Sequence, residues 1–224
     1  ITANPPLTGW TAAKILWVRN HEPENYERCR HILLPKDYIR YILTGVFATE
    51  VSDASGMQLL DVPNRCWSDE VLEKLNIDKA LLGKVYESCE VTGTILPDIA
   101  DKTGLSTETK VVGGAGDNAA AAVGTGVVKD GTAFTTIGTS GVVFAHSSQV
   151  TIDPKGRVHT CCAAVPGTWH VMGVTQAAGL SLKWFKENFC RKEIDEAKEK
   201  NMNIYGYLSK EAAMSFSIDK IYGL

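Results

Sequence analysis

The segment Gly113–Gly126, GGAGDNAAAAVGTG, constrains the fold of this chain more than any other. Its glycines allow a tight turn and a close approach of the backbone to a ligand, and the alanine run predicts a helix packed very closely against its neighbour. Lys110–Val112 predicts a brief strand just before the glycines. Such a strand-to-helix turn places the free N–H groups of the helix start and the carboxylate of Asp117 in one space. The segment therefore predicts either a ligand site or an ordinary tight turn.

The same turn contains the string GxGxxA at Gly114, Gly116 and Ala119, which is found in dinucleotide-binding folds. That interpretation requires a first strand before the string and an acidic residue about 20 positions after it. Near that position the chain has only Thr139. The sequence therefore disfavours a dinucleotide site.

The segment Thr135–Gly141, TTIGTSG, predicts a β-hairpin, because β-rich segments at 132–137 and 142–145 flank its last four residues, 138–141. Its four-residue tip, GTSG, consists of small residues. Backbone amides and small hydroxyls at such a tip can hold phosphate oxygens without steric obstruction. A plain hairpin turn is the alternative.

The length of 224 residues fits one large or two modest cores. We place a domain junction near Gly124–Asp130, which gives domains at 1–128 and 129–224. The remaining predicted strands are 158–164 and 169–174. The other predicted helices begin near Thr11, Pro23 and Ser68 or span Asp37–Gly45, Pro97–Lys102 and Gln176–Phe189. The last of these helices is expected to face inward with Leu180, Trp184 and Phe185, and Trp17 and Trp67 are expected to anchor cores. The remainder of the chain, after Phe189, is expected to be helical and exposed.

The charge of −3, from 23 basic and 26 acidic residues, is mixed along the chain. No basic field exists to attract nucleic acid or an anionic membrane. No apolar run reaches the roughly 18 to 20 residues of a membrane span, and the first residues lack the pattern of a signal peptide. The six cysteines form no CxxC pair. We therefore expect a cytoplasmic protein with reduced thiols and no nucleic-acid or membrane partner.

His159, Cys161, Cys162 and His170 raise the alternative of a metal site. Adjacent cysteines on a strand point to opposite faces and do not readily bind one ion. Two packed strands are the better interpretation, and we expect no metal ligands among these residues.

Several strings together resemble the FGGY family of carbohydrate kinases. They are GGAGDNAAAAVGTG, TTIGTSG, GWTAAKILWVRNHEPENY, ILLPKDYIRYILTGVFATEVSDASG and the LLDV before WSDEVLEKL. The resemblance covers essentially the whole chain. It implies parts of two ribonuclease H-like domains, an α/β fold as in actin and hexokinase, with sugar and ATP in the cleft between the complete domains. It also implies ATP-dependent phosphorylation of a ketopentose, with D-xylulose as the expected substrate.

The resemblance assigns the sugar side of the site to three residues. Asp117 is the expected catalytic base, and Asn118 and Trp10 are the expected sugar contacts. A helix start favours the ionised carboxylate and so makes it a weak base. Phosphoryl transfer tolerates a weak base, because its loose transition state needs the proton removed late.

The resemblance assigns the nucleotide side to Gly138, Thr139 and Ser140 of the hairpin tip and to Gly179. Mg²⁺ is expected to be bound chiefly by the ATP phosphates, because this ion keeps its waters and takes few protein ligands.

Two features of the family are absent from this sequence: a strand carrying a DxGT phosphate loop and a glycine pair that packs on adenine. The chain therefore resembles the central part of a longer kinase and is expected to be inactive by itself. Kinases for glycerol, gluconate or ribulose, and a non-catalytic sugar-binding fragment, remain alternatives. The sequence leaves the oligomeric state open, with a homodimer as one alternative.

Overall fold

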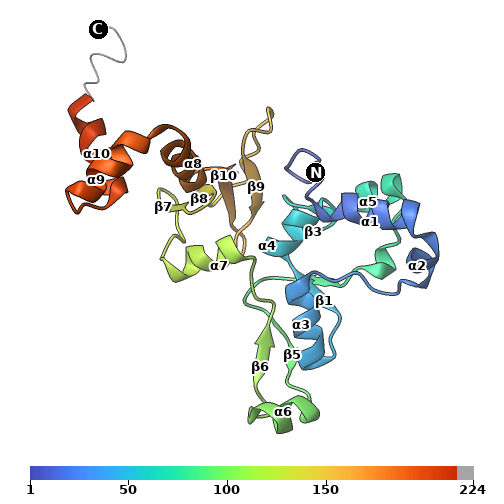
Figure 1. Ribbon diagram of the computed structural model, residues 1–224. Coiled ribbons are helices and arrows are strands. Elements are labelled where there is room, and N and C mark those ends of the chain that lie inside the picture. Colours follow the sequence, from blue (N-terminus) through green and yellow to red (C-terminus); the bar gives the residue numbers. More distant parts are fainter. Residues whose placement is uncertain (216–224) are drawn as a thin grey trace. The chain divides into compact units, whose positions relative to one another are not determined.

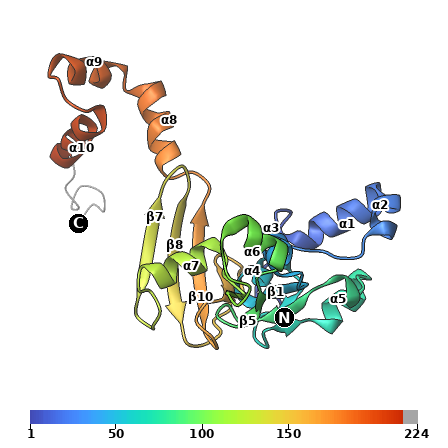
Figure 2. The ribbon, with the colours of Figure 1, turned by 90° about the horizontal axis from the view of Figure 1, so that it is seen from below.

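The structure is a computed structural model that describes residues 1–215 (Figures 1 and 2). It contains two compact units. The first comprises residues 1–135 and 142–174, and the second comprises residues 136–141 together with the described residues from 175 onward. Helices and strands are mixed throughout, in agreement with the predicted α/β class. The predicted domain boundary after residue 128 remains a prediction.

The chain begins with three helices, α1 (Thr11–His21), α2 (Pro23–Arg28) and α3 (Pro35–Thr44). Proline at the first position starts α2 and α3, since its missing N–H has no partner in the first helical turn. Gly45 ends α3 with a φ of 70°, the left-handed conformation that glycine adopts without strain. The structure thus confirms the helix predicted to end at Gly45 and begins it two residues earlier, at Pro35.

Short elements build the remainder of the first unit as far as the alanine helix. The strands are β1 (Ala48–Glu50), β2 (Leu60–Asp61), β3 (Cys66–Trp67), β4 (Lys84–Tyr86), β5 (Val91–Thr94) and β6 (Lys110–Val112). The helices are α4 (Val51–Ala54), α5 (Asp69–Leu75), α6 (Pro97–Thr103) and α7 (Asp117–Gly124), with 3₁₀ turns η1 (Ser55–Met57) and η2 (Lys79–Leu81).

These strands pair in twos: β1 runs parallel to β4, while β2–β3 and β5–β6 are antiparallel. Gly83 directly precedes β4 and lies against the backbone of Ala48 in β1. A Cβ there would lie 2.9 Å from backbone atoms of Ala48, so only glycine permits this approach.

A four-stranded sheet in the order β7-β8-β10-β9 follows. Its strands are β7 (Ala133–Ile137), β8 (Gly141–Ser147), β9 (His159–Cys162) and β10 (Trp169–Thr175). Residues 138–140 join β7 to β8, which confirms the predicted hairpin with a tip one residue shorter than expected. β9 and β10 form the predicted antiparallel pair.

Three helices end the described chain, α8 (Gly179–Phe189), α9 (Arg191–Glu199) and α10 (Ile204–Ser215). The expectation that Leu180, Trp184 and Phe185 face inward on α8 is wrong, because these side chains are 45%, 57% and 48% exposed. Instead, Trp184 meets Phe189 of the same helix edge to face, and Phe185 stacks on Phe189. Helical periodicity predicts that α8 has an apolar face, but it does not show that another part of the protein packs against that face. No helix among residues 1–215 is long and apolar enough to span a bilayer.

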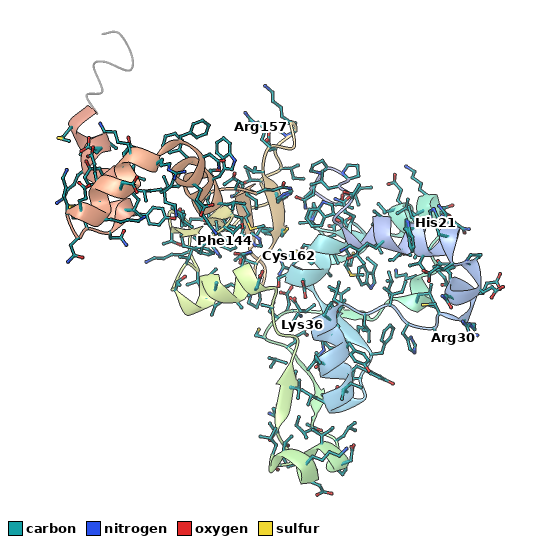
Figure 3. The ribbon with its side chains drawn as sticks, viewed as in Figure 1. His21, Arg30, Lys36, Phe144, Arg157 and Cys162 are labelled. Carbon is teal, nitrogen blue, oxygen red and sulfur yellow. The ribbon has the colours of Figure 1, made fainter. Side chains whose placement is uncertain are left out.

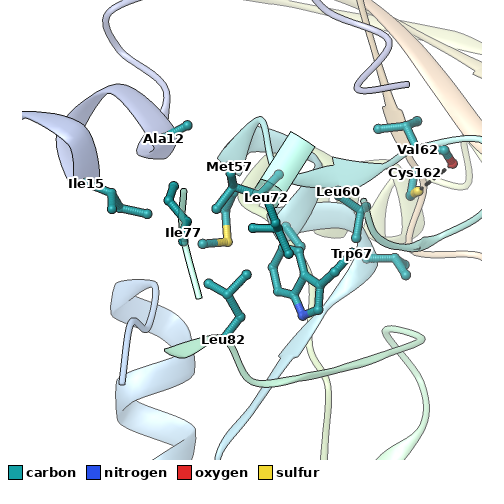
Figure 4. Packing of buried hydrophobic residues seen from close by; sticks show 13 residues of the cluster. Ala12, Ile15, Met57, Leu60, Val62, Trp67, Leu72, Ile77, Leu82 and Cys162 are labelled. Atoms are coloured by element: carbon teal, nitrogen blue, oxygen red, sulfur yellow. Dashed lines mark hydrogen bonds between the residues drawn. The ribbon is translucent and has the colours of Figure 1, made fainter. Parts of the chain in front are cut away.

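The main hydrophobic core lies in the first unit (Figure 4). Met57, Leu60, Trp67, Leu72 and Leu82 pack together there. The indole N–H of Trp67 donates to the carbonyl of Gly83 at 2.8 Å, so its one polar atom is satisfied inside the core. Trp67 is therefore the predicted anchor, whereas Trp17 is 53% exposed and stacks on His21.

We expect Leu60→Ala to lower the free energy of unfolding by about 2–5 kcal/mol, because Leu60 is fully buried and its loss leaves a cavity. Urea denaturation measures this change. Leu105→Ala is the control: it removes the same atoms at a 46% exposed position and should cost about 0.5 kcal/mol or less. Equal losses in the two variants would contradict the assignment of the core.

Candidate functional site

The predicted glycine turn joins the end of β6 to the start of α7. Gly114 has a φ of +78°, which favours glycine. A Cβ on Gly113 would lie 2.7 Å from the carbonyl oxygen of Glu87, so the backbone passes too close for any side chain. Both constraints explain the glycines, and the turn places Asp117 at the first position of α7.

Side chains from α3 and α4 hold this turn at both ends. Lys36 and Arg40 donate to the carbonyl oxygen of Gly113, with the Lys36 ammonium at 3.2 Å. At the other end the amide of Gly116 donates to Oγ of Ser52 at 2.9 Å. The residue that precedes Asp117 is thereby fixed to α4.

Glu50 lies beneath the turn and is completely buried. Its carboxylate caps α4 by accepting from the amides of Ser52 and Asp53, each at 2.8 Å. It also accepts from the hydroxyls of Ser52 and Ser88, at 2.9 and 2.8 Å, and from the Lys36 ammonium at 3.0 Å. A buried charge needs such partners, because an unpaired one is strongly destabilising.

A cavity of about 210 Å³ opens beside the turn within the first unit. It brings together three residues that the sequence assigned to the sugar side: Trp10, Asp117 and Asn118. Its remaining lining residues are Ser52, Asp53, Gly56, Gly116, Ala119, Cys161, His170 and Met172. Asp117 is exposed, and its carboxylate accepts from the amide of Asn118 at 2.7 Å.

Trp10 forms one wall of the cavity. Its ring meets His159 edge to face, with centroids 5.3 Å apart. Gly56 lies close to the same ring, where a Cβ would come within 3.2 Å of the indole. The ring therefore contacts both residues, while its buried N–H has no hydrogen-bond partner among the described residues.

Burial keeps two ionisable side chains of the cavity wall uncharged at neutral pH. It lowers the pKa of His170 to about 4, so the imidazole is neutral at neutral pH, and it raises the pKa of the Cys161 thiol to about 12. The pKa of Asp53 is raised by desolvation, against the lowering effect of Lys36. Asp53, Cys161 and His170 therefore belong to the candidate site, although sequence reasoning did not assign them a role there.

The adjacent cysteines have different surroundings. Cys161 lines the cavity, whereas Cys162 belongs to the hydrophobic core and its thiol donates to the carbonyl of Val62. Among residues 1–215, no three His, Cys, Asp or Glu side chains are grouped to hold a metal ion.

The four residues assigned to the nucleotide side meet in the second unit. The amide of Gly179 donates to the carbonyl of Gly138 at 2.8 Å, and the amide of Ala178 donates to that of Thr139 at 2.8 Å. A Cβ on Gly179 would lie 2.5 Å from the carbonyl oxygen of Gly138, so glycine is required at the start of α8. Thr139 and Ser140 are exposed at the hairpin tip.

We expect Asp53→Asn to stabilise the protein at neutral pH. A raised folded-state pKa means that the contribution of Asp53 to stability is full below its ordinary value of 3.8 and is lost as the pH rises through the folded-state value. The uncharged amide avoids this loss, so the gain in the free energy of unfolding should be larger at about pH 7 than at about pH 4.

Urea denaturation across this pH range measures the difference. Asp98→Asn, an exposed carboxylate on α6, should show little change in stability at either pH. A wild-type protein that is more stable than Asp53→Asn at neutral pH would contradict the expected sign.

Comparison with known proteins identifies the family. Residues 1–124 match the N-terminal domain of the FGGY family of carbohydrate kinases. A xylulose kinase of Lactococcus lactis is 45% identical over 189 residues, which are 84% of this chain and 38% of that protein. The chain thus spans about two fifths of the length of the curated relatives it matches.

Solved structures agree. A xyloylose (xylulose) kinase from Brucella ovis superposes with a TM-score of 0.81 and 41% identity, over 84% of this chain and 39% of that one. A gluconate kinase from Lactobacillus acidophilus superposes with a TM-score of 0.78 and 25% identity, over 84% of this chain and 38% of that one. The predicted α/β sugar-kinase fold and the predicted family are confirmed, and the chain belongs to the FGGY family of carbohydrate kinases.

Proposed function

We propose that the intact protein transfers the γ-phosphoryl group of ATP to D-xylulose, giving D-xylulose 5-phosphate and ADP. The observation that carries this proposal is the cavity that both the exposed Asp117 residue and the Trp10 ring line. The 45% identity to a xylulose kinase of Lactococcus lactis supports the choice of sugar.

Asp117 acts as the base in this reaction. The sugar hydroxyl oxygen forms a bond to the γ-phosphorus, the bond to the bridging oxygen of ADP breaks, and the hydroxyl proton passes to the carboxylate of Asp117. The exposed carboxylate can reach a bound hydroxyl, and its hydrogen bond from the Asn118 amide orients it.

Trp10 and Asn118 contact the sugar in this proposal. The indole offers a flat apolar face, and the amide side chain of Asn118 offers both donors and acceptors. Both residues line the same cavity as Asp117.

Gly138, Thr139, Ser140 and Gly179 bind the ATP phosphates. The exposed hydroxyls of Thr139 and Ser140 at the hairpin tip supply donors, and the small residues there leave room for phosphate oxygens. Mg²⁺ enters with ATP, because it retains its waters and binds chiefly through the phosphates.

The charge of the cavity favours a neutral sugar over a sugar acid. Among the described residues its lining contains no lysine or arginine, and it includes the carboxylates of Asp53 and Asp117 beside the neutral imidazole of His170. An anionic substrate such as gluconate would meet repulsion there. Glycerol and ribulose are separated from xylulose by assaying the intact protein with a panel of these polyols.

We also propose a cytoplasmic location, supported by the six cysteines, all free in the described structure. The proposed small-molecule partners are the sugar and ATP.

We predict that Asp117→Ala lowers kcat for xylulose phosphorylation about 10²- to 10⁴-fold while the protein stays folded, since loss of a general base costs that much. A coupled assay for ADP measures turnover, and circular dichroism measures folding. Asp98→Ala is the matched control, because Asp98 also stands exposed in the first turn of a helix, α6. Turnover near that of wild type in Asp117→Ala would remove this residue from catalysis.

We predict that Thr139→Val weakens ATP binding more than xylulose binding, because it replaces a hydroxyl at the hairpin tip by a methyl group. Calorimetric titration of the intact protein with each ligand measures both affinities. Thr136→Val, in strand β7 of the same hairpin, is the control and should change neither. Lost sugar affinity with intact nucleotide affinity would show that the tip is wrongly assigned.

A further inference from the structure

We propose that Lys36 and Glu50 form a positioning pair that fixes the turn Gly113–Gly116 and, through it, the direction of Asp117. The catalytic consequence of this pair rests on the proposed function. The structural consequence, a turn held in one conformation, does not.

The first argument is the position of the Lys36 ammonium, at the N-terminal end of α3 (Figure 3). It lies 3.0 Å from Glu50 of β1 and 3.2 Å from the carbonyl oxygen of Gly113. It also lies 3.6 Å from Asp37 and 3.7 Å from Asp53 of α4. One side chain therefore ties α3, β1 and α4 to the start of the turn.

The second argument is a relay from Glu50 to the end of the turn. The Ser52 hydroxyl donates to Glu50 at 2.9 Å, which directs its oxygen lone pairs away from the carboxylate. That oxygen accepts the amide proton of Gly116 at 2.9 Å. Because Gly116 is the N-cap residue of α7 and Asp117 follows it, the position of Glu50 is transmitted to Asp117.

The third argument is the charge balance beneath the turn. Asp37, Glu50 and Asp53 supply three carboxylates against Lys36 and Arg40. Arg40 is paired with Asp37 at 2.8 Å. Lys36 is therefore the cation paired with the fully buried Glu50 and near the cavity-lining Asp53, and its removal takes the ion-pair partner from Glu50.

Lys36 does not line the cavity, so its effect on a bound sugar acts through its neighbours, which are the turn and the cavity-lining Asp53. An error of about 1 Å in the place of a reacting group can cost about 100-fold in rate. A lysine that only holds Asp117 should thus lower kcat without changing the affinity for ATP.

The test compares the intact wild-type protein with Lys36→Met, Lys36→Arg, Ser52→Ala and Arg19→Met. Lys36→Met removes the charge and Lys36→Arg keeps it. Ser52→Ala removes the relay hydroxyl and spares the buried ion pair, and because Ser52 also lines the cavity, its amide exchange rather than its kcat tests the relay. Arg19→Met is the control, because Arg19 of α1 also donates to backbone carbonyls in the first unit, those of Leu75 at 2.6 Å and Asn76 at 3.0 Å, and these hydrogen bonds do not involve the turn. Hydrogen–deuterium exchange of peptides spanning residues 112–120 and steady-state kinetics with xylulose are measured for each.

We expect Lys36→Met and Ser52→Ala to speed amide exchange at Gly113–Asn118 about tenfold or more and to lower kcat about 10- to 100-fold, with KM for ATP unchanged. Lys36→Arg should restore most of both, and Arg19→Met should leave exchange of this peptide as in wild type. Should Lys36→Met fail to fold, the amide exchange of Ser52→Ala carries the comparison.

Unchanged exchange of the turn in Ser52→Ala and Lys36→Met would overturn the proposal, whatever the activity. So would an equal increase in Arg19→Met, since the effect would then be general loosening. A wild-type protein that phosphorylates no sugar, with the turn still loosened in both variants, would contradict the proposed function and leave the positioning pair supported.

Discussion

The burial of the Glu50 carboxylate is the constraint on which the first unit depends. A charge removed from water is tolerated only when hydrogen bonds and an opposite charge surround it. Glu50 meets this condition with partners from α3, α4 and the segment after β4. These segments, distant in sequence, must therefore come together for the carboxylate to be satisfied. The glycine turn is hydrogen-bonded to Lys36 and Ser52 of this arrangement, so the conformation of the turn depends on it.

The cavity beside the turn combines groups that burial keeps neutral with groups that remain charged. The His170 imidazole and the Cys161 thiol carry no charge at neutral pH, because desolvation disfavours their ionised forms. Asp53 lies between the opposing effects of burial and the Lys36 ammonium. A polyhydroxyl ligand suits such a wall, since hydroxyls both donate to carboxylates and accept from uncharged donors.

The sequence predicted the parts of this arrangement that are local. The glycines before Asp117 required a turn, the alanines after it predicted a helix, and GTSG between two β-rich segments required a hairpin. The expectation that this helix packs closely is wrong for most of its length, because only Ala119 and Ala122 of α7 are buried and Val123 is 51% exposed. The association of Gly179 with the hairpin tip followed from the family resemblance, and the structure adds the physical reason, the close approach to the carbonyl of Gly138.

The sequence did not reveal the long-range contacts. Lys36 and Glu50 belong to segments that indicated only the family. No local pattern shows that the side chain of a lysine will donate to a backbone carbonyl 77 residues away. Cys161 and His170 were weighed only as metal ligands, and their common cavity with Asp117 follows from the packing of β9 and β10 against earlier elements. Leu180 and Trp184 lie on an apolar face of α8 that is exposed. Helical periodicity predicts such a face but does not show whether another segment buries it.

The most direct measurement is a crystal structure of the intact protein with D-xylulose. The account predicts that the sugar occupies the cavity against the Trp10 ring, with one hydroxyl within about 2.6–3.2 Å of the Asp117 carboxylate. Xylulose bound at another place, with no hydroxyl near Asp117, would contradict it.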